Sequence, residues 1–295
     1  MMASQPLLKK YFPTPPPPQK QAQTVETPPT PPPTSAASAG TSTPAAGVTK
    51  QASSETETVI ESDLYRITFT NHGAQVKSWI LKKFDNDTEN GPLDLVNPAS
   101  APLYGYPLSL WTYDETLRGK LNSALYVTSR DGNQISFEYS DQDLAVRKTF
   151  TFDDTYVAKL ETSVNYKGAP VAAIPAWPSG FGDQTTPAFY ASSLIDYQYN
   201  KNIERLPIKK ISGGATVPGP FHWAGPNDQY FAAIFIPDEP ATAAMITLRD
   251  SLSIPKDPTQ KNSTEKINVE ILGAAVGNLH AATSERLFVC PKSLG

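Results

Sequence analysis

Short segments in which apolar and polar residues alternate constrain the fold of this chain more than any other feature. Within LYRITFT (residues 64–70), tyrosine, isoleucine and phenylalanine at 65, 67 and 69 share one parity, and arginine and threonine at 66, 68 and 70 share the other. Alternation with period two is typical of a β-strand with one buried face. The pattern returns in LAVRKTFTF (144–152) and YVAKLETSVNY (156–166). The sequence therefore predicts half-buried strands from about residue 55 onward.

Turn residues separate these segments at intervals typical of antiparallel sheets. Asn71-His72-Gly73 follows the first segment, and Arg130-Asp131-Gly132-Asn133 joins LYVTS to QISFEYS as a hairpin signal. Further strand-like runs are QYFAAIFI, TAAMITL, KINVEILGA and RLFVC, and no run with helical period is long enough to predict a helix. About fifteen short strands of this kind are typical of a sandwich. We predict an all-β fold, a large antiparallel β-sandwich, with an irregular stretch between Tyr166 and His222.

Residues 1–54 have a different composition from the rest of the chain. They contain PTPPPPQ, TPPTPPPT and SAASAGTSTPAAG, and the whole chain has 29 prolines in 295 residues. Proline favours polyproline II, and small polar residues offer little apolar surface to bury. We predict a disordered proline-rich linker over 1–54, with a proline-rich ligand for an aromatic groove as the alternative. The folded domain is predicted over 55–295, because about 240 residues can form a core without disulfides or metals.

Charge and cysteine content exclude several classes of protein. The formal net charge is −4 and no cluster of Lys and Arg is present, which argues against nucleic-acid binding. The single cysteine, Cys290, excludes an internal disulfide and any multi-cysteine metal site. No run of about 18 apolar residues predicts a membrane helix, and the first residues lack the apolar segment of a signal peptide. We expect this polypeptide to be soluble, and it is compatible with a piece of a longer protein.

The sequence predicts no catalytic, cofactor or metal site. The histidines, His72, His222 and His280, have none of the spacings used by metal ligands. The loop that starts with DNDTENG has Asn90 at its sixth position and Val96 at its twelfth, where a calcium loop needs glycine and glutamate. No base is identified beside Cys290, so its thiol is predicted to be buried and inert.

Aromatic side chains are the better functional candidates. Seven of them cluster in stretches rich in glycine and proline and could line a ligand cleft or a partner-binding surface. They are Tyr104, Tyr106, Trp111, Trp177, Phe181, Tyr197 and Tyr199. The alternative is that they fill the space between two sheets.

The stretch WAGPNDQYF (residues 223–231) reads as a structural signature. Its Gly-Pro-Asn-Asp sequence predicts a turn, because these residues favour tight turns. The apolar run after it predicts a buried strand that ends at Pro237. The signature residues are Trp223, Gly225, Asp228, Tyr230 and Phe231.

Several segments, taken in order, resemble the first large periplasmic domain of the YidC membrane-protein insertases. FHWAGPNDQYFAAIFIP resembles its Trp-Ala-Gly…Asp-x-Tyr-Phe signature, TNHGAQVKSWILKKF its opening hairpin and KTFTFDDTYVAKLETSVNYKG its central strand pair. RLFVCPKS resembles the closing strand, with Cys290 in place of the usual glycine, and PLLKKYF resembles the chain after the first membrane helix. The resemblance covers about residues 55–293.

This resemblance implies a β-supersandwich related to galactose mutarotase-like folds, on the periplasmic side of the bacterial inner membrane. A membrane helix before this chain and a helical segment after it would belong to the longer protein. The implied role is a non-catalytic accessory domain of an insertase and chaperone in protein transport, without a cofactor. The implied partners are nascent membrane proteins and Sec translocon components of the SecD/SecF type. We expect the contact region within residues 184–215.

Two other functions stay open at this point. A mutarotase-like sugar epimerase would need a carboxylate base and a histidine acid that converge on one sugar. A carbohydrate-binding module would use Trp111 or Trp177 as a stacking platform.

Overall fold

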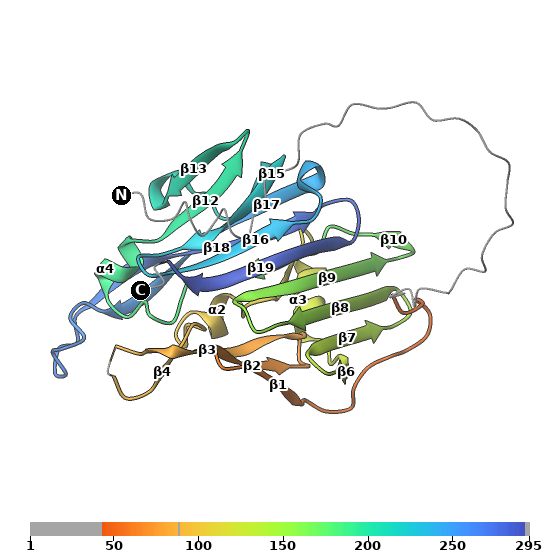
Figure 1. Cartoon of the computed structure of the whole chain (residues 1–295), viewed down its shortest axis with the longest axis horizontal. Helices are drawn as coiled ribbons and strands as arrows, with labels where there is room; N and C mark the ends of the chain where they lie inside the picture. Colours follow the sequence, from red (N-terminus) through yellow and green to blue (C-terminus); the bar gives the residue numbers. More distant parts are fainter. Residues whose placement is uncertain (1–42, 88, 293–295) are drawn as a thin grey trace, which may run out of the picture. The chain divides into compact units, whose positions relative to one another are not determined.

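The computed structural model describes residues 43–87 and 89–292, and these ranges contain three antiparallel sheets and a few short helices (Figure 1). The predicted all-β antiparallel class is confirmed. Residues 1–42 of the predicted linker 1–54 lie outside the described residues. No helix within the described ranges has the length and apolar character needed to cross a membrane.

Two of the three sheets have four and ten strands. A four-stranded sheet contains β1 (Glu57–Glu61), β2 (Tyr65–Thr70), β3 (Gln75–Asp85) and β4 (Pro92–Asp94) in that order. The ten-stranded sheet contains, in spatial order, β13 (Asn202–Pro207), β12 (Leu194–Tyr199), β15 (Phe221–Asn227), β16 (Phe231–Pro237), β19 (Thr283–Pro291), β9 (Val157–Tyr166), β8 (Leu144–Phe152), β7 (Gln134–Ser140) and β6 (Val127–Asp131), with β10 (Ala169–Pro170) beside β9.

A third sheet and five short helical segments complete the described structure. The five-stranded sheet has the order β14 (Ala215–Pro218), β17 (Ala243–Pro255), β18 (Lys266–Asn278), β11 (Ile174–Trp177) and β5 (Leu110–Trp111). The helical segments are α2 (Ala101–Tyr104), α3 (Glu115–Ser123), α4 (Pro187–Ala191), η1 (Ile208–Lys210) and η2 (Pro240–Thr242).

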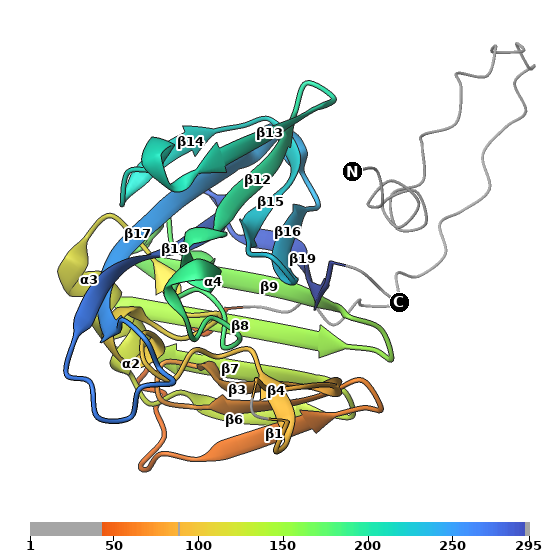
Figure 2. The same ribbon diagram turned by 90° about the vertical axis from the view of Figure 1, so that its left-hand side faces the viewer.

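The two smaller sheets pack against different parts of the ten-stranded sheet. Figure 2 shows β17 and β18 beside β12, β15 and β16, whereas β1 to β4 lie at the β6–β8 end. Phe69 on β2 stacks on Phe150 on β8 with ring centroids 5.1 Å apart. Trp79 on β3 meets Trp177 on β11 edge to face at 5.5 Å. One continuous apolar cluster therefore joins all three sheets, as a sandwich requires.

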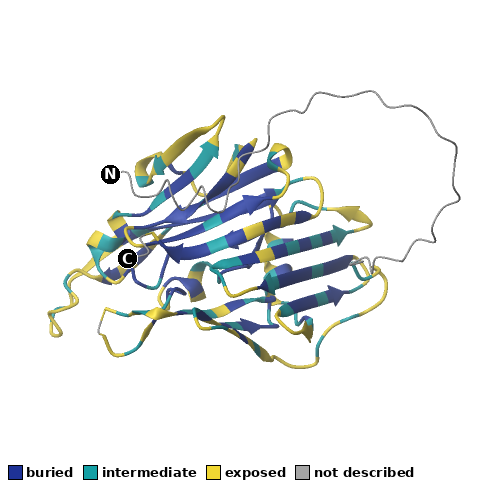
Figure 3. Ribbon diagram, viewed as in Figure 1, coloured by how far each residue is buried: buried dark blue, intermediate teal, exposed yellow. Residues whose placement is uncertain are grey.

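The alternation in the sequence matches the faces of the strands. In β2, Tyr65, Ile67 and Phe69 are all buried, as their shared parity predicts. In Figure 3 the buried positions concentrate in β16, β19 and β8, whereas β13 is exposed along most of its length. The inward face of β8 holds one charged side chain, Lys148, which is fully buried.

The expectation of no helix was wrong at α3. Asp114 caps this helix, since its Oδ1 accepts a hydrogen bond from the amide of Leu117 at 2.9 Å. An Asp at the N-cap followed by an acidic first turn is a helix-start signal, but nine residues give too short a period to recognise. The stretch predicted to be irregular also contains regular strands, since β11, β12, β13 and β14 all lie between Tyr166 and His222.

The packed region begins before residue 55, the boundary expected from the sequence. The compact unit spans Thr43–Lys292. Residues 43–54, which we call the leading segment, run beside β7 and bond to it through backbone groups: Lys50 and Ser140 exchange two hydrogen bonds of 2.8 and 2.9 Å. The amide of Ala52 donates to the carbonyl of Leu125 at 2.9 Å.

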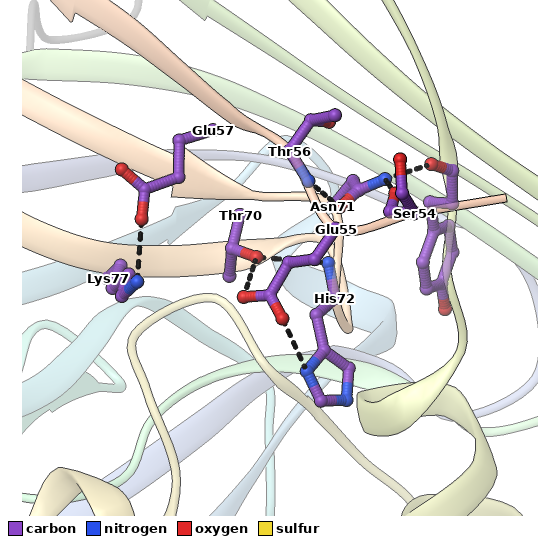
Figure 4. Close-up of polar contacts among 9 residues, drawn as sticks. Ser54, Glu55, Thr56, Glu57, Thr70, Asn71, His72 and Lys77 are labelled. Carbon is purple, nitrogen blue, oxygen red and sulfur yellow. Dashed lines mark hydrogen bonds and ion pairs between the residues drawn. The ribbon is translucent and has the colours of Figure 1, made fainter. Parts of the chain in front are cut away.

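Asn71 fixes the end of the leading segment to the first hairpin turn (Figure 4). Its buried amide group accepts a hydrogen bond from the amide of Thr56 at 2.7 Å and donates to the carbonyls of Ser54 and Tyr126 at 3.0 and 3.1 Å. In the same view, the carboxylate of Glu55 lies 3.7 Å from Nδ1 of His72. The Asn-His-Gly turn therefore does more than reverse the chain, because it also orients the segment that arrives from the N-terminal side.

Candidate functional site

Three of the seven predicted aromatic residues line one hollow. Tyr104, Tyr106 and Trp111 border a space of about 700 Å³ between α2, α3, β5 and β17, which we call the aromatic hollow. The hydroxyl of Tyr104 donates to the backbone carbonyl of Ser251, which ties α2 to β17. The volume is in the range of small-molecule sites.

The arginine side chains in the aromatic hollow are already engaged. Arg118 donates from two nitrogens to the carbonyl of Thr112, and its guanidinium carbon lies 4.6 Å from the ring centroid of Trp111. Arg249 forms a bidentate ion pair with Glu270, at 2.9 and 3.0 Å. Both arginines therefore stabilise the walls of the hollow and offer little free hydrogen-bonding capacity to a ligand.

The acid and base content of the aromatic hollow does not match sugar epimerisation. Its carboxyl groups belong to Glu115 and Asp250, and burial raises the pKa of Asp250. No histidine is among the residues that line it. The ring of Trp111 is only 8% exposed, because Arg118 covers it and Tyr113 meets it edge to face at 4.6 Å. This tryptophan therefore has no free face on which a sugar could stack.

Trp177 and Phe181 lie in the core. Trp177 is fully buried and its indole nitrogen donates to the carbonyl of Gly180 at 2.8 Å. Its ring centroid lies 5.5 Å from that of Phe181, which is also buried. At these two positions the aromatic residues fill the space between sheets, the alternative left open by the sequence.

Tyr197 and Tyr199 lie on β12, next to the free edge of the ten-stranded sheet. Tyr197 packs on Phe221, with centroids 6.2 Å apart, and Tyr199 is 37% exposed. The neighbouring strand β13 pairs only with β12 among the described strands. These two tyrosines therefore belong to a different surface from the aromatic hollow.

The geometry of the β12–β13 hairpin shows which backbone groups of β13 face outward. Asn200 and Lys201 form its turn with positive φ angles of 48° and 68°. In an antiparallel hairpin with a two-residue turn, the residue pair that closes the turn is hydrogen-bonded. Along the strands, hydrogen-bonded pairs then alternate with pairs whose N–H and C=O groups point away from the partner strand. Tyr199 and Asn202 are that closing pair, so the N–H and C=O groups of Ile203 and Arg205 point away from β12.

The surface of this hairpin is basic and partly apolar. Ile203 is 53% exposed. Residues 201–210 contain four basic side chains and one acidic side chain, in a chain whose net charge is −4. Arg205 is paired with Asp196 on β12 at 3.1 Å, and the lysines among these residues are exposed.

The WAGPNDQYF signature forms a turn, but the turn lies later than predicted. Gly225 and Pro226 belong to β15, and the chain reverses over Asp228–Tyr230. A Cβ on Gly225 would lie 1.9 Å from the carbonyl oxygen of Ala233, so close packing of β15 on β16 requires this glycine. Oδ1 of Asp228 accepts from the amides of Tyr230 and Phe231, both at 2.8 Å. Turn formation therefore depends on Asp228.

The other signature residues have structural contacts. Trp223 and Phe231 are 7% and 5% exposed. Tyr230 is 47% exposed and meets Phe189 of α4 edge to face at 5.9 Å. The signature thus joins α4 to the β15–β16 hairpin.

A buried carboxyl pair lies beside this turn. Asp183 and Asp228 are 6% and 2% exposed, and one carboxyl oxygen of each is buried without a hydrogen-bond partner. Burial, followed by the charge of Asp228, raises the pKa of Asp183 to about 8. The ammonium group of Lys292 donates to the carbonyl of Asp228 at 2.7 Å and to Oδ1 of Asn227 at 2.9 Å, and burial lowers its pKa.

Comparison with known families now identifies the chain. The sequence profile described as the YidC periplasmic domain matches residues 57–294. The chain belongs to the YidC periplasmic domain family. The resemblance drawn from WAGPNDQYF and the hairpin segments is therefore confirmed.

Two curated relatives of this YidC periplasmic domain are named as membrane protein insertases. It is 26% identical over 183 residues to the membrane protein insertase YidC of Endomicrobium trichonymphae, and the alignment covers 60% of this chain and 32% of that protein. It is 25% identical over 197 residues to YidC of Anaeromyxobacter sp. (strain Fw109-5), with 61% and 36% covered. The aligned chain thus spans about a third of the length of each relative.

Solved structures resemble the domain with low identity. A galactose mutarotase-like protein from Lactobacillus casei has a TM-score of 0.49 at 11% identity, covering 80% of this chain and 100% of that one. A putative aldose 1-epimerase from Escherichia coli has a TM-score of 0.47 at 11% identity, covering 80% and 99%. A YidC insertase crystal structure has a TM-score of 0.29 at 11% identity, covering 84% and 42%. None of these likenesses bears on a ligand or a reaction.

Three features of these surfaces were missed from the sequence. Arg118 and Arg249 give no local signal, since each acts through partners far along the chain or through a carbonyl. The carboxyl pair joins Asp183 to Asp228 across 45 residues of sequence, which no spacing rule predicts. The Asn-Lys turn of β12–β13 did carry a signal, because Asn tolerates left-handed backbone.

Proposed function

We propose that this domain is a non-catalytic periplasmic accessory domain of a membrane-protein insertase and that β13 is its contact strand. An extended segment of a partner polypeptide would add to the ten-stranded sheet beside β13. The partner we favour is a Sec translocon component of the SecD/SecF type, and nascent membrane proteins are the second class. The observation that carries the proposal is the free edge of β13, with the backbone groups of Ile203 and Arg205 directed outward.

Backbone pairing along a sheet edge supplies affinity without a deep pocket. Exposed edges are usually protected by bulges, proline or charge, since they otherwise pair with other chains. β13 has Pro207 at one end, and its Arg205 is paired with Asp196. Ile203 is nevertheless exposed, and the outward N–H groups of β13 pair with no other described strand. An added strand gains main-chain hydrogen bonds here, and its side chains supply specificity.

Charge favours an acidic partner segment. The exposed Lys201, Lys209 and Lys210 flank β13, and only Glu204 opposes them within the strand. Opposite charges at the rim of an interface increase the association rate more than the affinity. Binding to β13 should therefore weaken as salt increases.

Site-specific photo-crosslinking in cells that make the complete protein tests this proposal. A crosslinker at Ile203 is expected to capture a translocon subunit or a nascent chain, which antibodies to each would distinguish. The matched control is Val59, which is 39% exposed on β1, the edge strand of another sheet. Equal capture from Val59 would contradict the proposal.

A proline substitution tests the backbone pairing itself. Ile203→Pro removes one outward N–H but leaves the hydrogen bonds between β13 and β12, because proline is tolerated at an outward edge position. We expect crosslinking from the neighbouring position 205 to fall several-fold in Ile203→Pro and to persist in Ile203→Ala. If both variants crosslink like the unmodified protein, β13 is not the contact strand.

The two sugar functions have weaker support. The aromatic hollow has carboxyl groups but no histidine among its lining residues, and Trp111 is covered by Arg118. Titration with galactose and glucose separates the functions: epimerisation would indicate an enzyme, and binding without turnover would indicate a carbohydrate-binding module. We expect neither.

A further inference from the structure

A second hollow lies where β16 ends and β17 begins, and where β18 ends and β19 begins. It has a volume of about 400 Å³ and is bordered by the connection from β16 to β17 and by the connection from β18 to β19. At this end Pro237 of β16 pairs with Glu285 of β19 in the ten-stranded sheet, and Ala243 of β17 pairs with Asn278 of β18 in the five-stranded sheet. We call it the acidic hollow.

The charges of the acidic hollow are all negative. Its lining includes the carboxyl groups of Asp238, Glu239 and Glu285, and it includes no lysine, arginine or histidine. Asp238 and Glu239 are exposed at the mouth. One carboxylate oxygen of Asp238 accepts a hydrogen bond from Ser284 at 2.5 Å, which leaves its other oxygen available.

Glu285 distinguishes the acidic hollow from an ordinary acidic surface. The residue is fully buried on the inward face of β19, beside Leu287 and Val289, and neither carboxylate oxygen has a hydrogen-bond partner. A buried carboxyl without partners costs free energy that a protein seldom retains without a reason. Burial, followed by the charge of Asp238, raises the pKa of Glu285 well above its ordinary value.

A neighbouring hydroxyl shows the same lack of partners. Oγ1 of Thr162 on β9 is buried and unpaired, and Thr162 lies opposite Thr283 on β19, two residues from Glu285. Unpaired buried oxygens therefore lie on two adjacent strands, β19 and β9, near the acidic hollow.

The arrangement favours an organic cation over a metal ion. Among the described residues, no three Asp, Glu, His or Cys side chains are grouped closely enough to hold a metal. A guanidinium or ammonium group on a flexible stem can reach one buried carboxylate while its stem lies in the hollow and neighbouring carboxylates attract it at the mouth. A hollow of about 400 Å³ is large enough for one such side chain.

We propose that the acidic hollow binds a lysine or arginine side chain of a partner polypeptide, with Glu285 as the buried counter-charge and Asp238 and Glu239 at the mouth. This site is separate from β13 and does not depend on the function proposed for that strand. The Glu285 oxygens are sealed from solvent when the hollow is empty, so the connection between β18 and β19 must shift as the cation enters. Ala281 and Ala282 lie in this connection and line the hollow, and their small side chains hinder the shift little.

Binding of the cation should release a proton. In the empty hollow, burial favours the protonated form of the Glu285 carboxyl, because it raises the pKa of this group. In the complex the carboxylate pairs with the cation, and the proton that it loses passes to buffer. Calorimetry of the complete 295-residue chain with N-acetyl-L-arginine amide, in two buffers of different ionisation enthalpy, measures this release. We expect up to one proton per site at pH 7 for the unmodified chain.

Variants and ligand analogues complete the test. Glu285→Gln keeps the shape of the side chain, and we expect it to weaken binding about tenfold to a hundredfold, as loss of a charged hydrogen bond does. Glu204→Gln, on exposed β13, is the matched control and should bind normally. N-acetyl-L-citrulline amide has the shape of the arginine probe without its charge and should not bind.

Several outcomes would overturn the proposal. These are absence of arginine and lysine binding, equal binding of the citrulline probe, undiminished binding to folded Glu285→Gln, or binding of calcium alone. If Glu285→Gln fails to fold, the proton release of the unmodified chain decides the question, because binding without proton release excludes Glu285 as the counter-charge.

Discussion

Two antiparallel hairpins of the ten-stranded sheet, β8–β9 and β12–β13, have the same backbone pairing and opposite surroundings. Every inward position of β8 is buried, and Phe150 on this strand contacts Phe69 of the second sheet. On β13 no residue is fully buried, and Leu206 alone is partly covered. Backbone pairing therefore does not decide how firmly a strand is held, because burial of one face contributes most of the stabilisation.

The difference also separates stability from recognition. A strand packed on both sides cannot offer its backbone to a partner, whereas an edge strand with one neighbour can. The leading segment gives an intermediate case, since it bonds to β7 through Lys50 and Ser140 but is exposed over much of its length. We expect mutations in β8–β9 to change stability and mutations in β12–β13 to change binding.

Phe150→Ala should have the largest effect on stability. The ring is fully buried and stacks on Phe69, so its removal leaves a cavity between two sheets. We expect a loss of about 3–5 kcal/mol in the free energy of unfolding, measured by urea denaturation. The matched control is Tyr199→Ala on β12, whose aromatic ring is 37% exposed and should cost about 1 kcal/mol or less. Similar losses for the two variants would remove the contrast between the hairpins.

The sequence predicted the β8–β9 hairpin and not the β12–β13 hairpin for a physical reason. A strand buried on one face alternates. LAVRKTFTF matches β8 from the first residue to the last, and YVAKLETSVNY matches β9 apart from its first residue. Every residue of Asn202–Pro207 is exposed except Leu206, which is partly buried. The segment therefore has no apolar period that the sequence could reveal. Its turn signal, Asn200-Lys201, lacks the glycine that usually follows asparagine.

The sites were less predictable than the fold, because they join residues distant in sequence. Tyr104 and Trp111 come together at the aromatic hollow, but Trp177 and Phe181 are core residues, although all four occur in similar stretches of sequence rich in glycine and proline. A glycine-rich aromatic segment gives the same pattern whether it borders a cavity or fills one. The buried charge of Lys148 was also hidden, because it shares the parity of apolar neighbours that dominate β8.

Lys148→Met should have the next largest effect and a distinctive pH dependence. The ammonium group donates to the carbonyls of Ala74 and Leu108, both at 2.6 Å, so methionine leaves two buried acceptors unpaired. We expect a loss of about 2 kcal/mol at pH 7, reduced by removal of the cost of burying a charge.

The pH dependence follows from the direction of the shift. Burial lowers the pKa of Lys148 to about 7, below the value of about 10.4 in an unfolded chain. Between these values the unfolded chain binds more protons, so this group makes the protein more stable as pH rises. The stability gap between the unmodified chain and Lys148→Met should therefore widen from pH 7 to pH 9.5 in parallel urea titrations. A constant gap would mean that Lys148 keeps an ordinary pKa.

Asp183→Asn tests the region of the ten-stranded sheet between β12–β13 and β8–β9, because Asp183 lies beside Asp228 at the β15–β16 turn. The pKa of Asp183 is raised to about 8, above the value of about 3.9 in an unfolded chain. The folded chain binds the extra proton between these values, so stability falls as pH rises from 4 to 8, by up to about 1.4 kcal/mol per pH unit. Asparagine cannot titrate, and the variant should lose less stability than the unmodified chain between pH 5 and pH 8. Thermal unfolding at both pH values measures this difference, and Glu204→Gln, an exposed substitution, should leave the original slope unchanged.

Ile203→Ala should have the smallest effect on stability, and a comparison within one strand makes that informative. Ile203 is 53% exposed on the outer face of β13, whereas Leu206 is partly buried against the core and lies opposite the fully buried Ile195. Truncation of a half-exposed side chain away from any cap or cavity changes stability by about 0.5 kcal/mol or less. Leu206→Ala should cost about 1–2 kcal/mol, because it removes partly buried apolar surface.

If Ile203→Ala costs as much as Leu206→Ala, the outer face of β13 is packed in solution and is unavailable to a partner. If it leaves unfolding unchanged but lowers capture of a translocon subunit by a crosslinker at position 205, then β13 contributes to binding and adds nothing to folding, unlike β8.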